Sequence, residues 1–229
     1  MEKYKEEFIQ FAVRTGVLKF GSFTLKSGRQ SPYFFNAGDF KTGEQLSKLA
    51  EYYAGCYADN INPKKLQNVV LFGPAYKGIP LVAITAVKLY DIHNISLPIC
   101  YNRKEVKDHG EGGTTVGAGM NENTNVVVVE DVVTAGTAIG ETIEVLKGNG
   151  GAKLAAVIIA VDRMEKRTED SKETTLQEVV HTYGIEIFPV VNIEEILEYL
   201  YNREIDGKVY IGDKEKAEIE EYLAKYGAK

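Results

Sequence analysis

Residues 126–138 read VVVVEDVVTAGTA and are the most informative stretch of this chain. The four valines are β-branched and do not alternate with polar residues, which is typical of a strand buried on both faces of a parallel sheet. Two acids, Glu130 and Asp131, follow the valines, and a Thr-Ala-Gly-Thr turn then leads into a helical pattern. This order of strand, turn and helix predicts one unit of an α/β fold.

Three further apolar runs have the same character; they cover residues 69–72, 154–161 and 185–191. Helical patterns follow two of the four runs, at residues 79–90 and 138–147. The second pattern stops at residues 148–151, Gly-Asn-Gly-Gly, a strong C-terminal breaker. The alternation predicts a central, mostly parallel sheet flanked by helices and joined by right-handed crossovers.

The N-terminal part differs from this central pattern. Residues 4–15 are amphipathic and predict a helix. Two short aromatic runs, 20–25 and 31–35, flank a turn at residues 26–29. They predict a hairpin or cap built onto the sheet.

The C-terminal part carries two more helical patterns, at residues 194–201 and 214–226. The second is mostly charged and predicts a solvated surface helix. No Gly-, Ser- or Pro-rich linker divides the chain, so we expect one domain over residues 1–229. Its expected parts are a cap at about 1–40, a core at about 41–200 and a C-terminal helical extension at about 201–229.

Composition excludes several classes of protein. With 44% hydrophobic and 26% charged residues the chain is neither disordered nor fibrous. Lys and Arg number 27 against 33 Asp and Glu, and the net charge of -6 disfavours a nucleic-acid binder. Two cysteines, Cys56 and Cys100, are too few for a disulfide framework, which favours a reducing, cytoplasmic location. No apolar run reaches the ~18 residues of a membrane span, and the charged start does not resemble a signal peptide.

The turn at residues 134–137 has the features of a phosphate-binding cradle. Gly136 allows close backbone approach, Thr134 and Thr137 offer hydroxyl groups, and the first N–H groups of the helix are unpaired. The neighbouring acids would repel a phosphate unless they face sugar hydroxyls or Mg²⁺ on the same ligand, so the pattern indicates a phosphorylated sugar. The alternative is that a threonine is only a helix N-cap and the acids are solvated.

This stretch resembles the phosphoribosyl-pyrophosphate signature of type I phosphoribosyltransferases. Three more motifs resemble orotate phosphoribosyltransferases in the same order; they are KSGRQSPYFFN at 26–36, GPAYKGIP at 73–80 and NRKEVKDHGEGG at 102–113. The similarity runs from Tyr4 to about Tyr199, with Glu130 where those enzymes commonly carry Asp. It implies the type I phosphoribosyltransferase fold with a small N-terminal hood. It also implies a Mg²⁺-dependent pentosyltransferase of pyrimidine biosynthesis, which converts orotate and 5-phosphoribosyl 1-pyrophosphate to orotidine 5′-phosphate and pyrophosphate.

The resemblance also implies a set of site residues. Glu130 and Asp131 would hold the ribose hydroxyls and, indirectly, a magnesium ion carried by the pyrophosphate. The 5′-phosphate segment would be Thr134, Ala135, Gly136, Thr137 and Ala138. The pyrophosphate would meet Lys77, Arg103, Lys104, Lys107 and His109. Tyr76, Val132 and Val133 would also bind substrate. Orotate would meet Lys26, Phe34, Phe35, Thr134 and Arg163. The catalytic set would be Lys77, Arg103, Lys104, Lys107, His109 and Asp131.

Several of these assignments also have support from residue chemistry. The cationic, glycine-flanked loop at residues 103–113 suits a lid that stabilises a departing pyrophosphate, although charged runs are commonly only solvated loops. Lys77 lies between glycines, outside any nucleotide P-loop pattern, and is either a pyrophosphate ligand or an exposed structural residue. Phe34 and Phe35 point to opposite faces of a strand, which leaves one for the core and one for a flat ring. Arg163 could pair bidentately with the orotate carboxylate.

The resemblance further implies a homodimer in which each lid reaches over the neighbouring subunit. Two rival functions remain at this point. A purine phosphoribosyltransferase would share the cradle but should lack the Lys26 and Phe34–Phe35 cap. A regulator that senses the same sugar phosphate would need no cationic lid, and a DNA-binding one would need a basic surface.

Overall fold

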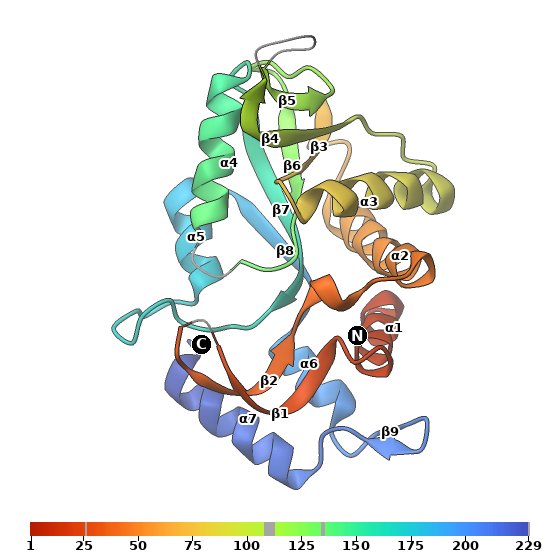
Figure 1. The fold of residues 1–229 in the computed structure, drawn as a ribbon, viewed down its shortest axis with the longest axis vertical. Coiled ribbons are helices and arrows are strands. Elements are labelled where there is room, and N and C mark those ends of the chain that lie inside the picture. The colour runs from red at the N-terminus through yellow and green to blue at the C-terminus, as the bar shows by residue number, and fades with distance from the viewer. Residues whose placement is uncertain (26, 108–112, 134–135, 229) are drawn as a thin grey trace.

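The computed structural model of the chain describes residues 1–25, 27–107, 113–133 and 136–228. Its centre is a six-stranded sheet in the order β5-β4-β3-β6-β7-β8 (Figure 1). The strands are β3 (Val69–Gly73), β4 (Ile99–Lys107), β5 (Gly113–Gly117), β6 (Asn125–Val129), β7 (Lys153–Asp162) and β8 (Glu186–Asn192). Neighbouring strands run parallel except β5, which pairs antiparallel with β4. The prediction of a mostly parallel sheet is therefore confirmed.

Helices cover both faces of the sheet (Figure 1). Those helices are α2 (Gly43–Asn60) and α3 (Gly78–His93) on one face, and α4 (Thr137–Gly148) and α5 (Thr175–Tyr183) on the other. The valines of β6 alternate between these layers: Val127 and Val129 pack toward α2 and α3, and Val126 and Val128 toward α4 and α5. All four are 0% exposed. An unbroken apolar run is the sequence pattern that such a doubly covered strand requires.

Strand β8 explains why its sequence pattern is interrupted. It contains Pro189 and lies at the edge of the sheet, paired only with β7 within the described sheet. A proline cannot donate a backbone hydrogen bond, and an edge strand has one side on which none is needed. The predicted fourth run of the sheet is confirmed over Glu186–Asn192.

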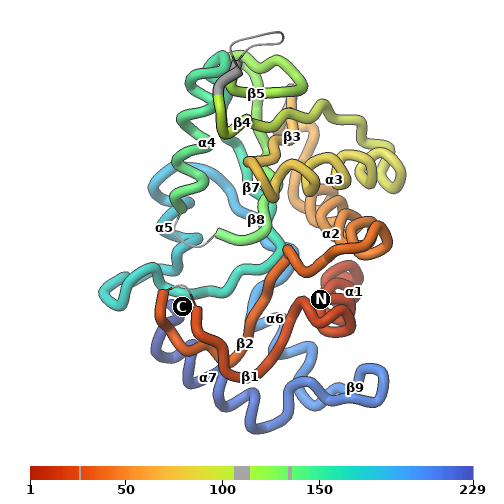
Figure 2. Tube along the Cα trace, in the orientation of Figure 1, coloured from red at the N-terminus to blue at the C-terminus, as the bar shows by residue number. Residues whose placement is uncertain are grey.

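The cap is built from both ends of the chain. The N-terminal part supplies α1 (Lys3–Arg14), the antiparallel hairpin β1 (Leu18–Thr24) and β2 (Gln30–Phe35), and a 3₁₀ turn, η1 (Ala37–Asp39). The C-terminal part follows β8 with α6 (Ile193–Leu200), the short pair β9 (Glu204–Ile205) and β10 (Lys208–Val209), and α7 (Asp213–Tyr226). Figure 2 shows the blue C-terminal segment alongside the orange-red hairpin, and α7 contacts β2.

The charge of α7 predicts a solvated surface helix, but part of α7 is buried. Ile219 and Tyr222 are buried, and the Tyr222 ring meets the Tyr33 ring of β2 edge-on at 6.0 Å between centroids. Leu223 and Tyr226 also pack against the core, but charged residues dominate the composition of α7, so its few inward-facing apolar side chains did not reveal the packing. The C-terminal extension is also not wholly helical, because it includes the β9–β10 pair.

The predicted lid is only partly a loop. β4 continues through Arg103 and Lys104 to Lys107, and β5 returns from Gly113 in an antiparallel hairpin. The sequence pattern misses these strands because a hairpin at a sheet edge pairs through its backbone and can keep charged side chains in water. The tip, which includes His109, lies outside the described residues.

Candidate active site

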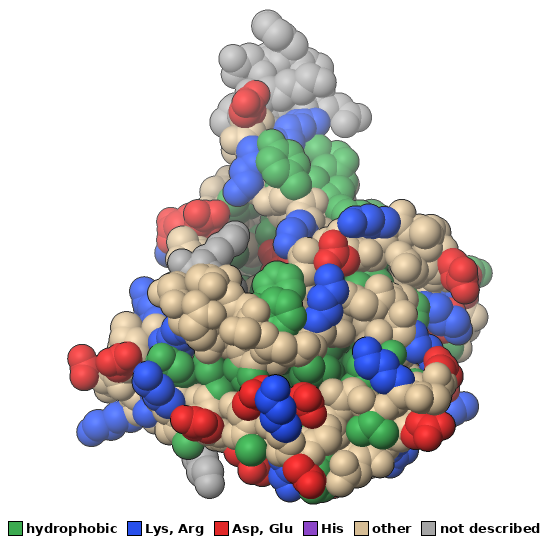
Figure 3. All heavy atoms as spheres, turned by 60° about the horizontal axis from the view of Figure 1, so that its bottom comes forward, with side chains coloured by type: hydrophobic (Ala, Val, Ile, Leu, Met, Phe, Trp, Pro, Cys, Tyr) green, Lys and Arg blue, Asp and Glu red, His purple; other side chains and the backbone are tan. Residues whose placement is uncertain are grey.

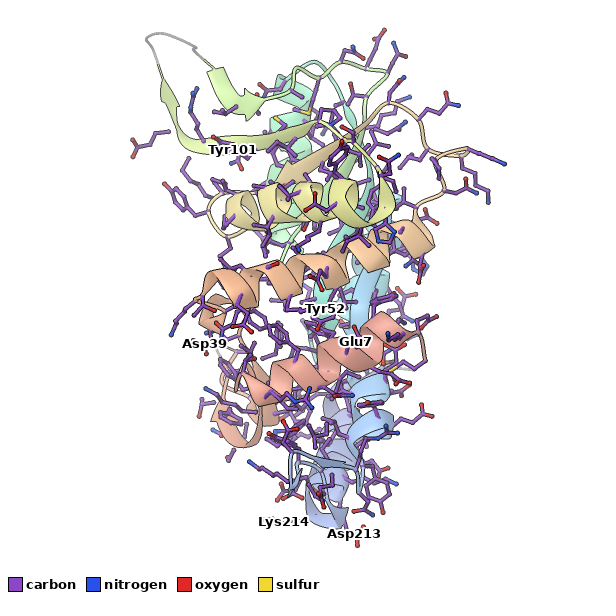
Figure 4. All side chains as sticks on the ribbon, turned by 90° about the vertical axis from the view of Figure 1, so that its right-hand side faces the viewer. Glu7, Asp39, Tyr52, Tyr101, Asp213 and Lys214 are labelled. Carbon is purple, nitrogen blue, oxygen red and sulfur yellow. The ribbon has the colours of Figure 1, made fainter. Side chains whose placement is uncertain are left out.

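Three connecting segments gather at the carboxyl edge of the sheet, after β3, β6 and β7. These strands are neighbours and run parallel, so their C-terminal ends meet at one edge, where open α/β sheets bind ligands. The hairpin β4–β5 lies toward one end of the molecule and the cap toward the other. Figure 4 shows both on the same side, with Tyr101 on the hairpin above and Asp39 after β2 below.

Two glycines allow the tight turn between β3 and α3. A Cβ atom on Gly73 would lie 2.2 Å from the carbonyl oxygen of Gly78 and 2.6 Å from Val82 Cγ1. A Cβ atom on Gly78 would lie 2.6 Å from Pro74 Cδ. A side chain at either position would force the turn open. The two glycines therefore fix the backbone path of the turn that carries Lys77.

Asn102 of β4 fixes the middle of this turn from the neighbouring strand. Its Oδ1 accepts a hydrogen bond from the backbone N–H of Ala75 at 2.8 Å. Tyr76 and Lys77, the next residues, are exposed. The contact couples the turn to the strand that carries Arg103 and Lys104. Sequence analysis did not single out Asn102, although it opens the third motif.

Lys77 and Asp131 form an ion pair between the β3–α3 turn and the end of β6. Lys77 Nζ lies 2.8 Å from Asp131 Oδ2, while Asp131 Oδ1 accepts the N–H of Val132 at 2.8 Å. The lysine side chain is 60% exposed and the carboxylate only 12%. Because exposed ion pairs are weak, the lysine can leave for a more highly charged anion while Asp131 stays in place.

Glu130, the residue before Asp131, contacts the backbone of Asp131 in this pair. Its Oε1 accepts the N–H of Asp131 at 3.0 Å, and its backbone carbonyl accepts the hydroxyl of buried Tyr53 at 2.8 Å. Burial raises the pKa of Glu130 to about 7, and the negative charge of Asp131 adds to the rise. Two adjacent carboxyl groups thus differ in environment: Asp131 is ion-paired, and burial favours the protonated form of Glu130 up to about neutral pH.

We expect Glu130→Gln to remove part of the pH dependence of stability. Burial raises the pKa of Glu130 from 4.5 to about 7, so the folded protein keeps a proton that the unfolded chain releases. The wild type should therefore lose stability as pH rises through this window, and the variant should not. Thermal unfolding of the unliganded proteins at pH 5 and pH 8 measures this, with exposed Glu122→Gln as control. A Glu130→Gln difference of equal size at both pH values would contradict the expectation.

The start of α4 forms the described part of the cradle. Gly136 has a φ of 71°, which favours glycine, and a Cβ atom there would lie 2.7 Å from Val179 Cγ2 of α5. Thr137 and Ala138 are exposed in the first turn of α4, where helix N–H groups attract anions. Val132 and Val133 are partly buried against the two cores, and the N–H of Val132 already donates to Asp131 Oδ1. Thr134 and Ala135 lie outside the described residues.

Arg163, directly after β7, is held by a dense set of contacts. Its Nε and Nη2 donate to Glu165 Oε1 at 2.8 and 2.6 Å, and Nη2 donates to Ser31 Oγ of β2 at 3.1 Å. The guanidinium lies over the Tyr33 ring, 4.3 Å from its centroid. The edge of the guanidinium formed by Nε and Nη2 is thus already occupied by Glu165. A ligand carboxylate cannot pair bidentately with that edge in this arrangement.

The two cap phenylalanines divide as expected. Phe35 is buried beside Phe8, with ring centroids 6.2 Å apart. Phe34 is partly exposed and stacks on Phe23 with ring centroids 5.6 Å apart. Lys26 lies outside the described residues.

The structure brings together Lys77, Glu130 and Asp131, and separately Arg163 with the cap. Among the described residues, Lys104 pairs with Glu141 of α4 at 3.8 Å, and both side chains are exposed. In the part of the chain that the structure describes, no group of three or more His, Cys, Asp or Glu side chains is placed to hold a metal ion. None of the helices in those ranges combines the length and apolar character needed to cross a bilayer.

Comparison with known proteins gives consistent similarities. The phosphoribosyl transferase domain family matches residues 42–190. The orotate phosphoribosyltransferase of Clostridium acetobutylicum is 47% identical over 229 residues, 100% of both chains. That of Photobacterium profundum is 47% identical over 227 residues, 99% of this chain and 100% of the other. The crystal structure of orotate phosphoribosyltransferase from Francisella tularensis has a TM-score of 0.82 at 41% identity and covers 97% of this chain and 100% of its own.

Proposed function

Because the chain belongs to the orotate phosphoribosyltransferases of the phosphoribosyl transferase family, we propose that it transfers the phosphoribosyl group from 5-phosphoribosyl 1-pyrophosphate to orotate. The products are orotidine 5′-phosphate, an intermediate of pyrimidine biosynthesis, and pyrophosphate. The observation that carries this proposal is the Lys77–Asp131 pair at the carboxyl edge of the sheet, next to strand β7, which Arg163 directly follows. In this proposal Asp131 would bind the sugar, Lys77 on one side would bind the pyrophosphate, and Arg163 on the other would bind the orotate carboxylate.

The sugar phosphate would lie along the end of β6. The N–H groups at the start of α4 would receive the 5′-phosphate, with Gly136 allowing the close approach. Asp131 and Glu130 would accept hydrogen bonds from the ribose hydroxyls. The Asp131 carboxylate is already oriented by the N–H of Val132, so binding would cost it little reorganisation.

In the reaction the bond from ribose C1 to the pyrophosphate oxygen breaks, and a bond from C1 to orotate N1 forms. The leaving pyrophosphate takes the electron pair of the broken bond, and the proton of orotate N1 is released to water. Lys77 would leave Asp131 for the pyrophosphate, where Arg103, Lys104, Lys107 and His109 would add positive charge from the lid. These cations act where negative charge develops, which lowers the barrier to bond breaking. No covalent nucleophile is required.

Magnesium is the cofactor that we propose for the sugar pyrophosphate. Mg²⁺ prefers oxygen ligands and keeps several waters, and the carboxylates of Glu130 and Asp131 suit contact through those waters. Bound there, the ion would neutralise phosphate charge. Lys77 and the lid cations would supply the remaining compensation.

Orotate would lie between the cap and the end of β7. Phe34 would cover its ring, and Lys26 and Thr134 would contact its polar groups. Arg163 would receive the carboxylate on Nη1, because the contacts with Glu165 and Ser31 use Nε and Nη2. This placement is the feature that separates orotate from a purine base.

Arg163→Lys is expected to raise the KM for orotate by about tenfold or more, because Lys keeps the charge but cannot hold Glu165 with one edge and offer a further nitrogen to the orotate carboxylate. The KM for the sugar pyrophosphate should change by less than about twofold, a span within roughly 0.4 kcal/mol. Steady-state kinetics with each substrate varied in turn measures both values. Equal rises in the two constants would show that Arg163 does not read the orotate carboxylate.

We also propose a cytoplasmic homodimer. Helix α3 supports the dimer, because Pro80, Ala83, Val87 and Tyr90 form an apolar stripe along its outer face at helical spacing, and three of them are exposed. On the face shown in Figure 3, acidic and basic side chains are interspersed rather than gathered by sign, which supports small-molecule substrates over nucleic acid. Cys56 and Cys100 are buried free thiols, as a reducing compartment allows.

The test of the proposed function is the loss of orotate absorbance with the sugar pyrophosphate and Mg²⁺. Adenine, hypoxanthine and uracil serve as controls, and we expect turnover of orotate at far higher rates than of any of these. Turnover of a purine but not of orotate would overturn the proposal.

A further inference from the structure

We propose that Glu165 is a specificity-determining positioning residue: it fixes the orientation of Arg163 so that one free end of the guanidinium faces a ligand carboxylate. The inference deepens the proposed function and rests on it. Glu165 lies two residues after Arg163, in the segment between β7 and α5, and was not among the predicted site residues.

The carboxylate of Glu165 lies between two arginines. Its Oε1 accepts from Nε and Nη2 of Arg163, and its Oε2 lies 3.4 Å from Nη1 of Arg29. The hydroxyl of Tyr33 also donates to Oε1, at 3.3 Å. The three charged side chains are between 13% and 17% exposed. Ion pairs that are this well shielded from water hold their geometry far better than surface pairs.

These contacts fix Arg163 in three directions. Glu165 takes the edge formed by Nε and Nη2, Ser31 takes the remaining N–H direction of Nη2, and the Tyr33 ring covers one face of the guanidinium. The hydroxyl of Tyr222 on α7 also interacts with the Arg163 guanidinium and with Glu165, and the Nη1 end is what remains for a ligand. A preorganised donor gains affinity because no side-chain freedom is lost when the ligand arrives.

The charge of the cluster favours a single carboxylate as its ligand. Arg29 and Arg163 carry two positive charges against one negative charge on Glu165. The adjacent acid Asp162 directs its carboxylate to the N–H of Met164 instead. One further carboxylate at Nη1 would complete the pairing of a largely buried cation. A ring without a carboxylate would leave Nη1 unpaired.

The backbone around Glu165 is held as firmly as its side chain. Its carbonyl accepts the N–H and hydroxyl of Thr175, where α5 begins, at 2.8 and 3.0 Å. Arg29 also donates to the carbonyl of Lys166 at 3.0 Å and stacks over the Tyr226 ring of α7. The orientation of Arg163 is therefore coupled to the cap and to the C-terminal helix, which gives that helix an indirect part in substrate recognition.

The test is Glu165→Gln, which keeps the shape and removes the charge. We expect the KM for orotate to rise about tenfold, with the KM for the sugar pyrophosphate within about twofold. The preference for orotate over uracil should fall by a similar factor, because uracil has no carboxylate for Arg163 to hold. Glu173→Gln is the matched control, since this glutamate lies in the same segment and pairs with exposed His181.

A double-mutant cycle separates positioning from a general structural effect. If Glu165 acts through Arg163, Glu165→Gln should have no further effect on orotate KM in an Arg163→Ala background. An undiminished effect there, or equal rises in both substrate constants, would overturn the inference. Ser31→Ala, which removes the other contact on Nη2, provides the same test should Glu165→Gln not fold. Failure of the wild type to use orotate would instead overturn the proposed function.

Discussion

Replacing Asp131 by asparagine should lower kcat/KM by about 10² to 10³, the cost of removing one charged, preorganised contact from a transition state. The carboxylate is fixed by Lys77 and the N–H of Val132, so it is already oriented when the sugar arrives. Asparagine can still accept the N–H of Val132 but cannot supply the charge that a developing cation on the ribose requires. The loss should therefore appear in kcat as well as in KM.

Stability should change little in the same variant, because the partner of Asp131 is an exposed lysine and such pairs contribute little. Asp206→Asn is the matched control: this aspartate also pairs with a cation, Arg14, at 2.7 Å, but on the exposed C-terminal hairpin. Steady-state kinetics and thermal unfolding of both variants decide the question. A large fall in melting temperature with little loss of rate would mean that Asp131 is structural.

The fold could be predicted from sequence where the hydrophobic pattern of a segment matches the burial of its side chains. The four valines of β6 face two cores at once, so each had to be apolar, and the pattern was unambiguous. The hairpin β4–β5 and the inner face of α7 were not predicted as such. In the hairpin and in α7, charged side chains that face water outnumber the apolar side chains that pack. The sequence pattern of each segment is therefore mostly polar and hides the buried face.

Only part of the candidate site could be predicted, for a related reason. Motifs identify residues that follow a strand, which is how Lys77, Asp131 and Arg163 were found. They do not show which side chains meet across elements. The Lys77–Asp131 pair joins residues 54 positions apart, and Ser31 and Arg163 are 132 apart. Glu165 and Asn102 act on neighbours rather than on a ligand, so nothing in the sequence separated them from ordinary polar residues.

The lid is expected to serve the site of the neighbouring subunit in a homodimer. It is carried on the edge hairpin β4–β5, which lies at one end of the molecule, away from the cap (Figures 1 and 4). Its cations would repel Lys77 unless an anion lay between them, so the closed arrangement should depend on the phosphorylated substrate. The apolar stripe on α3 offers a surface for the second subunit.

Mixing two inactive variants tests this arrangement directly. One variant carries Lys104→Ala and Lys107→Ala in the lid, and the other carries Asp131→Ala at the end of β6. If lids cross, each mixed dimer contains one site with an intact acid and an intact lid, and one site with both defects. Random reassociation of equal amounts makes about half of the dimers mixed, so activity should return to about a quarter of wild type. If each lid serves its own subunit, every site keeps one defect and mixing restores nothing. A monomeric protein in sedimentation experiments would equally end the hypothesis.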